Sequence, residues 1–191
     1  MAKLYLLDAS NGKLIWKNEH KVFFISQIKV DRDRFYVLDA SNIFTCYSLS
    51  NGKKIWECKG ATKLINAQQQ TSVSINNENV IFNNSKGEII SLDKMSGNLN
   101  WLTPTIEYGE SLQSFLVKNS DLVLNDNSIY FSNNNNSFFS LDVNLGLVNW
   151  KQRINSYLRP VIIDTIVLTI SPKGYLYMAL IQISEPTRRT P

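Results

Sequence analysis

The sequence predicts an all-β fold assembled from small four-stranded antiparallel sheets, and two observations support this prediction. First, four segments of the 191-residue chain repeat one pattern, in which a tryptophan follows a glycine by four residues. Second, short runs of strand-forming residues alternate with turns rich in Asn, Asp, Ser and Gly, without any long stretch of helical periodicity. Each repeat is therefore expected to form one sheet.

The repeated segments are residues 5–16, 45–56, 90–101 and 139–150. Their spacing of about 40 to 49 residues is typical of proteins built from stacked units. A four-stranded sheet buries little surface alone, so each unit needs neighbours on both faces, and radial stacking into a β-propeller is the usual solution. The repeats thus predict propeller blades.

In chain order, the first copy is partial and covers about residues 1–17. The second copy covers 22–58, with strands expected at 25–30, 35–39, 43–49 and 53–57. The third covers 70–102, with strands at 71–75, 80–82, 88–93 and 98–102. The fourth covers 114–151, with strands at 121–124, 129–132, 138–142 and 147–151. A fifth, partial copy covers 158–183, and 184–191 is an irregular tail; residues 1–183 are treated as one segment.

The turn before each tryptophan contains a glycine and, in three of the four copies, an aspartate at fixed positions, and each is expected to have a structural role. Asp8, Asp93 and Asp142 stand four residues before the glycine, where a carboxylate can accept backbone N–H bonds, and Ser48 replaces the aspartate in the second copy. The glycine supplies a positive φ that closes a hairpin with a bulge. The tryptophan offers a flat face to the next unit. The glycines and tryptophans of this structural motif are Gly12, Trp16, Gly52, Trp56, Gly97, Trp101, Gly146 and Trp150.

These residues resemble the repeats of the pyrroloquinoline quinone (PQQ)-like propellers, whose tryptophan-docking motif is roughly Leu-Asp-x-x-(Thr/Ser)-Gly-x-x-x-Trp. Residues 92–101 and 7–16 match it closely. The plain repeats are most similar to the BamB-like family of outer-membrane assembly lipoproteins. That resemblance implies a non-enzymatic periplasmic scaffold, associated with the outer membrane, that binds a protein partner of the β-barrel assembly machinery. No signal peptide or lipid-acceptor cysteine is visible before the first expected strand, so this localisation rests on the resemblance.

Two alternatives stay open. A PQQ-dependent dehydrogenase would bring adjacent cysteines and carboxylates holding Ca²⁺, whereas Cys46 and Cys58 are twelve residues apart and no calcium-ligand spacing is present. A generic PQQ-like binding module of the cell envelope is the other. The recurrence of the aspartates at equivalent turns favours a structural role, so we expect no catalytic residues, no cofactor and no metal.

The remaining features indicate ordinary packing. The net charge of +4 and the scattered basic residues argue against nucleic-acid binding, and no apolar run is long enough for a transmembrane helix. The two cysteines could pair, but we expect them to be small apolar fillers in neighbouring strands. His20, the one histidine, has no second ligand at metal-binding spacing and is expected to lie in a solvated loop.

Partner binding is expected at the joins between blades, residues 59–70 and 103–119. The candidate contact residues there are Leu64, Ile65, Tyr108, Leu112 and Phe115. Four and a fraction repeats are too few for a closed propeller of six to eight blades. We therefore expect an open arc of about four blades, part of a larger propeller, with uncovered end faces that favour association.

Overall fold

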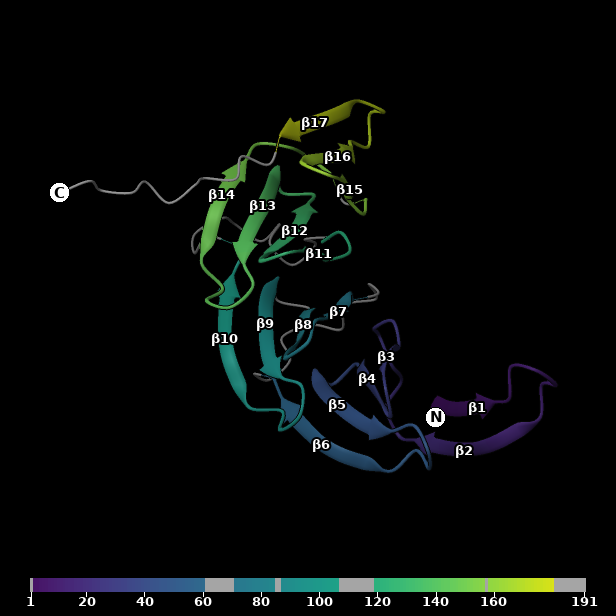
Figure 1. Cartoon of the computed structure of the whole chain (residues 1–191). Coiled ribbons are helices and arrows are strands. Elements are labelled where there is room, and N and C mark those ends of the chain that lie inside the picture. The colour runs from purple at the N-terminus through teal and green to yellow at the C-terminus, as the bar shows by residue number, and fades with distance from the viewer. Residues whose placement is uncertain (1, 61–70, 85–86, 107–118, 157, 181–191) are drawn as a thin grey trace.

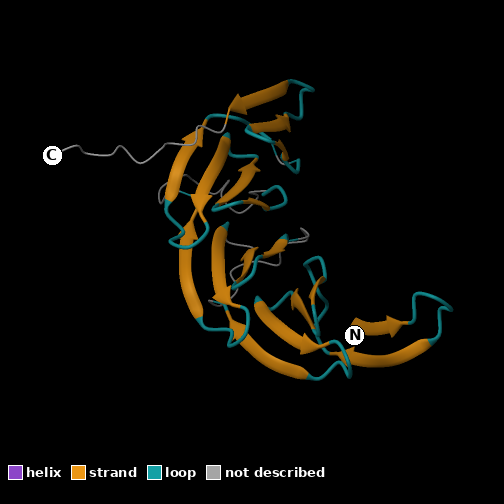
Figure 2. Ribbon diagram, viewed as in Figure 1, coloured by secondary structure: helices purple, strands orange, loops and turns teal. Residues whose placement is uncertain are grey.

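A computed structural model of the chain describes residues 2–60, 71–84, 87–106, 119–156 and 158–180. These residues form 17 β-strands in five antiparallel sheets that follow one another along an open arc (Figures 1 and 2). The described residues contain no helix. The expected all-β fold of four-stranded blades in an open arc is confirmed.

The first sheet has two strands, β1 (Ala2–Leu7) and β2 (Leu14–His20). The second sheet has the order β3-β4-β5-β6 and consists of Lys29–Asp31, Arg34–Leu38, Ile43–Ser48 and Lys54–Lys59. The third sheet is β7-β8-β9-β10, made by Val73–Ile75, Asn79–Asn83, Glu88–Asp93 and Leu99–Pro104.

The fourth sheet, β11-β12-β13-β14, consists of Val123–Asn125, Ser128–Asn133, Ser137–Asp142 and Val148–Gln152. The fifth sheet has three described strands, β15 (Val161–Ile163), β16 (Ile166–Ile170) and β17 (Leu176–Leu180). In Figure 1 the first strands of the complete sheets lie toward the inside of the arc, and β6, β10 and β14 form its outer edge.

The innermost strands are shorter than the sequence predicts. The structure begins β3 at Lys29 rather than at residue 25, and β7 at Val73 rather than at residue 71. The preceding residues bond to the neighbouring unit instead: Ser26 and Thr71 form a parallel bridge, and the Thr71 N–H donates to the Ile25 carbonyl at 2.7 Å. The strand pattern was correct in type, but these backbone groups join two sheets rather than extending one.

The hydrophobic core lies between the sheets, because the middle strands are buried on both faces. Phe44 of β5 and Phe82 of β8 are almost fully buried and stack with ring centroids 4.1 Å apart, across the gap between the second and third sheets. Ile81 of β8 faces the other way and joins Phe131 and Leu141 in the next core cluster. Burial of apolar surface between successive sheets therefore holds the arc together.

Truncation of a ring at this interface tests that statement. We expect Phe44→Ala to lower the free energy of unfolding by about 3–5 kcal/mol, because it leaves a cavity in a fully buried cluster. Leu145→Ala, at a side chain that is 65% exposed, is the control and should change it by no more than about 0.5 kcal/mol. Urea unfolding curves measure both; equal losses would contradict an inter-sheet core.

Candidate functional site

The tryptophans of the first three repeats each pack on the glycine turn of the following sheet. A Cβ atom added to Gly52, Gly97 or Gly146 would lie 3.0, 2.6 or 2.5 Å from the ring of Trp16, Trp56 or Trp101, in that order. The distances at Gly97 and Gly146 are too short for a real Cβ contact, and the one at Gly52 is at the limit, so glycine lets the ring approach this closely. The three glycines also have positive φ angles of 66°, 77° and 68°.

Each of these indoles also forms a hydrogen bond with the same place in the next turn. The ring N–H of Trp16, Trp56 and Trp101 donates to the backbone carbonyl three residues before the glycine. The acceptors and distances are Leu49 at 2.8 Å, Lys94 at 3.3 Å and Val143 at 2.9 Å. We call this combination of stacked ring and hydrogen bond the indole junction.

The aspartates of the motif shape these same turns. The carboxylate of Asp93 accepts the N–H of Met95 at 3.1 Å and that of Ser96 at 2.7 Å. Hydrogen bonds from the Ser96 hydroxyl and backbone lower the pKa of Asp93, and those from Ser10 lower the pKa of Asp8. Ser48 instead lies 2.9 Å from the Ser50 hydroxyl. The registers shift by a bulge beside each turn, as expected for these hairpins.

An ion pair reinforces the junction between the second and third sheets. The Nζ of Lys94 donates to Asp31 at 2.7 Å and to the Asn76 carbonyl at 3.2 Å, and its side chain is only 9% exposed. The Lys94 carbonyl accepts from the Tyr36 hydroxyl as well as from Trp56. Lys94 thus binds the β7–β8 loop of its own sheet and strands of the preceding sheet, through both its side chain and its backbone.

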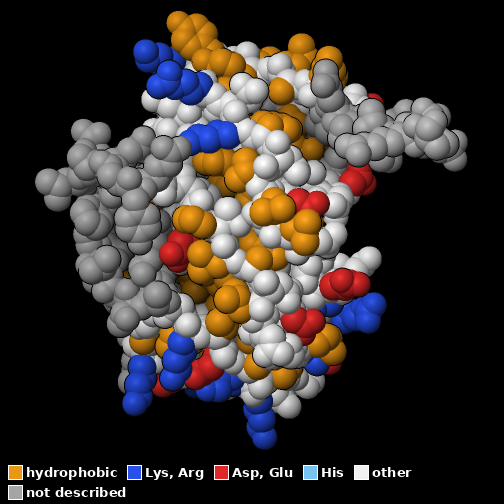
Figure 3. All heavy atoms as spheres, turned by 90° about the vertical axis from the view of Figure 1, so that its left-hand side faces the viewer, with side chains coloured by type: hydrophobic (Ala, Val, Ile, Leu, Met, Phe, Trp, Pro, Cys, Tyr) orange, Lys and Arg blue, Asp and Glu red, His pale blue; other side chains and the backbone are white. Residues whose placement is uncertain are grey.

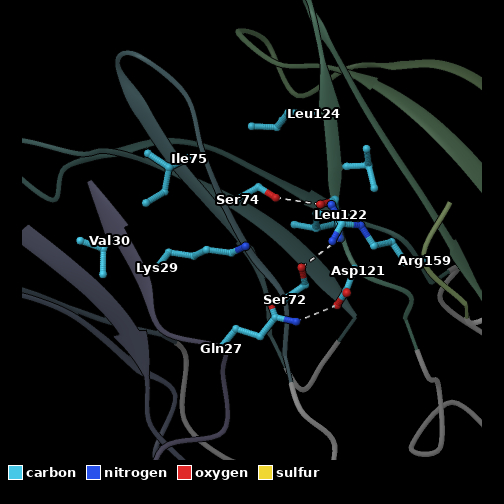
Figure 4. Close-up of a pocket in the computed structure, with 11 residues that line it drawn as sticks. Gln27, Lys29, Val30, Ser72, Ser74, Ile75, Asp121, Leu122, Leu124 and Arg159 are labelled. Atoms are coloured by element: carbon cyan, nitrogen blue, oxygen red, sulfur yellow. Dashed lines mark hydrogen bonds between the residues drawn. The ribbon is translucent and has the colours of Figure 1, made fainter. Parts of the chain in front are cut away.

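A cavity of about 300 Å³ opens among the inner strands of the three complete sheets (Figure 4). Lys29 and Arg159 contribute positive charges to its wall, and Asp121 contributes a carboxylate, which the Gln27 amide approaches at 3.5 Å. The Ser74 hydroxyl donates to the Leu122 carbonyl at 2.8 Å. The cavity therefore has a polar wall that includes two basic residues and one acidic residue.

The outer edge of the arc carries a second, apolar feature. Figure 3 shows hydrophobic side chains gathered along this face. The exposed ones on the third and fourth sheets form what we call the outer-rim patch, and they come from β10, β14 and the turns that precede them: Met95, Leu99, Leu102, Leu145, Leu147 and Val148. A broad hollow of about 720 Å³ lies beside it, lined by Met95, Leu99 and Asn144 among others.

Comparison with known proteins decides the family. A family model described as outer membrane protein assembly factor BamB matches residues 1–182. The chain belongs to the BamB family. Among curated proteins, none matches the chain. Its arc is similar to BamB from Moraxella catarrhalis, with a TM-score of 0.78 and 16% identity over 94% of this chain. The chain spans 55% of the length of that protein.

Two further solved structures show the same fold. The computationally designed Ika8 protein has a TM-score of 0.69 at 10% identity, covering 92% of this chain and 52% of its own. The dihydro-heme d1 dehydrogenase NirN, solved in complex with DHE, has a TM-score of 0.67 at 16% identity, covering 90% of this chain and 37% of its own. The BamB family's architecture is thus shared with a designed protein and with an enzyme.

The cysteines of this BamB-family chain are packed as apolar side chains. Cys46 of β5 is fully buried and Cys58 of β6 is partly buried, and neither forms a disulfide. The ladder pairs Cys46 with Trp56, and Cys58 with Phe44. Burial raises the pKa of Cys46 to about 11 and also raises that of Cys58, so both thiols stay protonated at neutral pH.

His20 differs from its expected place in a solvated loop. It ends strand β2 and packs edge-on against Phe24 and Tyr47, with ring centroids 4.9 and 5.4 Å away. The Tyr47 hydroxyl lies 3.4 Å from Nδ1. The alternation of β2 turns this side chain, like that of Trp16, toward the second sheet. The expectation failed because the sequence showed the charged neighbours of His20 but not the continuation of the strand.

The expected partner-binding residues of this BamB-family chain lie outside the described residues. Leu64 and Ile65 fall in residues 61–70, and Tyr108, Leu112 and Phe115 fall in residues 107–118. Within the described ranges, no group of three or more His, Cys, Asp or Glu side chains is arranged to hold a metal ion. The same ranges contain no helix long and apolar enough to cross a membrane.

Two glycines of the motif provide a matched test of the indole junction. Gly97→Ala and Gly12→Ala both place a Cβ at a positive φ, 77° and 71°, but only at Gly97 does that Cβ meet a ring. We expect Gly12→Ala to cost about 1 kcal/mol from backbone strain and Gly97→Ala to cost a further 1–3 kcal/mol or so. Urea unfolding of both variants measures this; equal costs would show that the close approach is unimportant.

The pH dependence of stability tests the environment of His20. Burial lowers the pKa of His20, outweighing the attraction of Asp39, so the unfolded chain takes up the proton first as the pH falls. The stabilisation by neutral His20 is then complete above the unfolded pKa of about 6.5 and is lost as the pH falls toward the folded value. We expect wild type to lose more unfolding free energy than His20→Gln between pH 7.5 and 5.5. An equal loss would place His20 in solvent.

Proposed function

We propose that this BamB-family chain is a non-enzymatic propeller scaffold that binds a protein partner during assembly of β-barrel proteins into the outer membrane. It would act in the periplasm, associated with that membrane, with residues 1–183 forming one propeller segment. The observation that carries the proposal is the family match over residues 1–182. The similarity of the arc to a BamB of known structure supports the scaffold part of it.

The use made of the repeated side chains supports a scaffold as well. The carboxylates of Asp93 and Asp142 accept hydrogen bonds from backbone N–H groups of their turns, and the first three tryptophans are packed between sheets. The side chains that define the repeat are therefore occupied in building the arc. Loops and exposed apolar side chains remain as the surfaces through which a partner can be bound.

We place the partner-binding face at the joins between blades, residues 59–70 and 103–119. Loops between elements commonly carry binding residues, and the sequence of these joins includes the apolar residues Leu64 and Phe115. The outer-rim patch is the competing surface, because Leu99 and Leu147 are 57% and 63% exposed. The two surfaces can be separated by substitution.

The test is co-purification of the tagged chain with purified components of a β-barrel assembly complex. We expect the chain to retain a component, and the double substitution Leu64→Ser with Phe115→Ser to reduce the amount at least about tenfold. The matched control is Leu99→Ser with Leu147→Ser, which removes two leucines of the outer-rim patch and should leave binding intact. Circular dichroism verifies that both variants fold. If only the Leu99→Ser, Leu147→Ser variant lost binding, the partner-binding face would be the outer-rim patch. If wild type retained no component, the scaffold proposal would be rejected.

A second function is favoured by one observation. The inner cavity is lined by Lys29, Arg159 and Asp121, which come from separate parts of the arc. A PQQ-dependent dehydrogenase or a ligand-binding module of the envelope would use such a cavity. Quinone absorbance in the purified protein together with Ca²⁺-dependent alcohol oxidation would support the enzyme and count against the scaffold.

A further inference from the structure

The outer-rim patch departs from the pattern of the repeat. Four of its side chains, Met95, Leu102, Leu145 and Leu147, are apolar where the other three copies carry polar or charged residues. The residues at the matching positions are, in that order, Ser10, Ser50 and Asn144; Lys17, Glu57 and Lys151; Asn11, Asn51 and Ser96; and Lys13, Lys53 and Asn98. Because those copies form the same hairpin with polar side chains, the fold does not require an apolar residue at any of the four positions.

These departures come together at the junction between the third and fourth sheets. The turn that carries Leu145 and Leu147 is held against β10, because the Thr103 hydroxyl donates to the carbonyl of the glycine between them at 2.6 Å. Met95, in the turn of the third sheet, lines the same hollow as Asn144 of the fourth-sheet turn. The patch is therefore one surface across two sheets, and exposed apolar surface that is gathered in this way marks a site for another molecule.

The turns around this surface are acidic. They are β7–β8, β9–β10, β11–β12 and β13–β14, and with the residue that precedes each turn they contain one basic residue, Lys94, and four acidic ones: Glu78, Asp93, Asp126 and Asp142. In Figure 3, acidic side chains lie among the apolar ones in the middle of this face, whereas basic ones lie mostly toward its top and bottom. The whole chain has a net charge of +4, so this acidic character is local.

The basic side chains that reach these turns are already engaged. The Nζ of Lys94 lies 2.7 Å from Asp31, and the Lys94 side chain is only 9% exposed. Arg34 of the second sheet donates to the Met95 carbonyl at 3.1 Å and lies 4.0 Å from the carboxylate of Asp33. Among the described residues that line the hollow beside the patch, two are acidic and none is basic. The surface thus offers apolar contacts beside uncompensated negative charge.

We propose that the outer-rim patch binds a basic amphipathic segment of a partner protein. The apolar side chains of that segment cover Met95, Leu145 and Leu147, and its Lys or Arg side chains face the acidic residues of the surrounding turns. An amphipathic helix with one apolar and one basic face has this chemistry. The inference goes beyond the scaffold function, whose partner we place at the joins between blades, and does not depend on it.

A membrane surface fits this patch less well. Anionic lipid headgroups attract basic residues placed beside apolar ones, whereas Glu78 and Asp93 beside Leu99 would repel them. A second copy of the chain is the remaining occupant, and the experiment below separates it from a partner segment.

The test is fluorescence anisotropy with the full chain and a labelled peptide made of two copies of the heptad Leu-Lys-Lys-Leu-Leu-Lys-Leu. As a helix this peptide has leucines on one face and lysines on the other. We expect saturable binding, and binding at least about tenfold weaker when every lysine of the peptide is replaced by glutamate. Glu78→Gln should weaken binding of the lysine peptide about threefold and make it less sensitive to salt.

A double substitution tests the apolar contacts. Met95→Ser with Leu145→Asn introduces the residues that the first two repeats carry at these positions, so the variant should fold as wild type does, which urea unfolding verifies. It should bind the lysine peptide at least about tenfold more weakly. The matched control is Leu14→Ser with Ile15→Ser, at β2 side chains that are 53% and 56% exposed, and it should bind as wild type does.

Four results would overturn the proposal. Two of them are equal binding of the lysine and glutamate peptides, and unchanged binding by the Met95→Ser, Leu145→Asn variant. The third is binding to vesicles of phosphatidylethanolamine and phosphatidylglycerol that this variant abolishes, which would assign the patch to a lipid surface. The fourth is self-association that grows with concentration and disappears in the same variant, which would make a second copy the occupant.

Discussion

The arc depends on one contact, a tryptophan ring pressed on a glycine turn of the next sheet. Each sheet is a single layer with hydrophobic side chains on both faces. It therefore gains most of its stability by packing against the sheets on either side. The ring of Trp101 and its N–H bond to Val143 fix both the distance and the orientation of the next sheet. The Gly146 turn accepts the ring only because no Cβ stands in its way. At each of the three indole junctions, the size of the ring, its hydrogen bond and the backbone conformation of the glycine therefore act at one position.

Hydrogen bonds and an ion pair between the sheets supplement this contact. The ion pair of Lys94 with Asp31 is largely shielded from solvent, and the Lys94 carbonyl accepts hydrogen bonds from both Tyr36 and Trp56. Toward the inside of the arc, Ser72 and Ser74 exchange hydrogen bonds with Leu122. These bonds satisfy backbone groups at strand ends that would otherwise be buried without partners. They align the sheets, whereas the apolar clusters supply the driving force.

The repeat made the fold predictable from the sequence. Gly97 and Trp101 recur at fixed spacing with strand-like segments between them, and this pattern leaves little choice of architecture. Contacts between sheets could not be predicted, because no local sequence pattern indicates that Thr71 hydrogen-bonds to Ile25 or that Lys94 pairs with Asp31. His20 shows the same limit, since its burial depends on Tyr47 of another sheet. The inner cavity was missed for the same reason, because its lining residues, among them Lys29 and Arg159, are far apart in the sequence.

The most direct test of the central contact is a double-mutant cycle between Trp101 and Gly146. Unfolding free energies are needed for wild type, Trp101→Ala, Gly146→Ala and the double variant. If the ring and the glycine turn form one junction, Gly146→Ala should cost at least about 1 kcal/mol less once the ring is gone, since its clash is then relieved. Additive effects within about 0.3 kcal/mol would show that ring and turn act independently, and would contradict the account given for the arc.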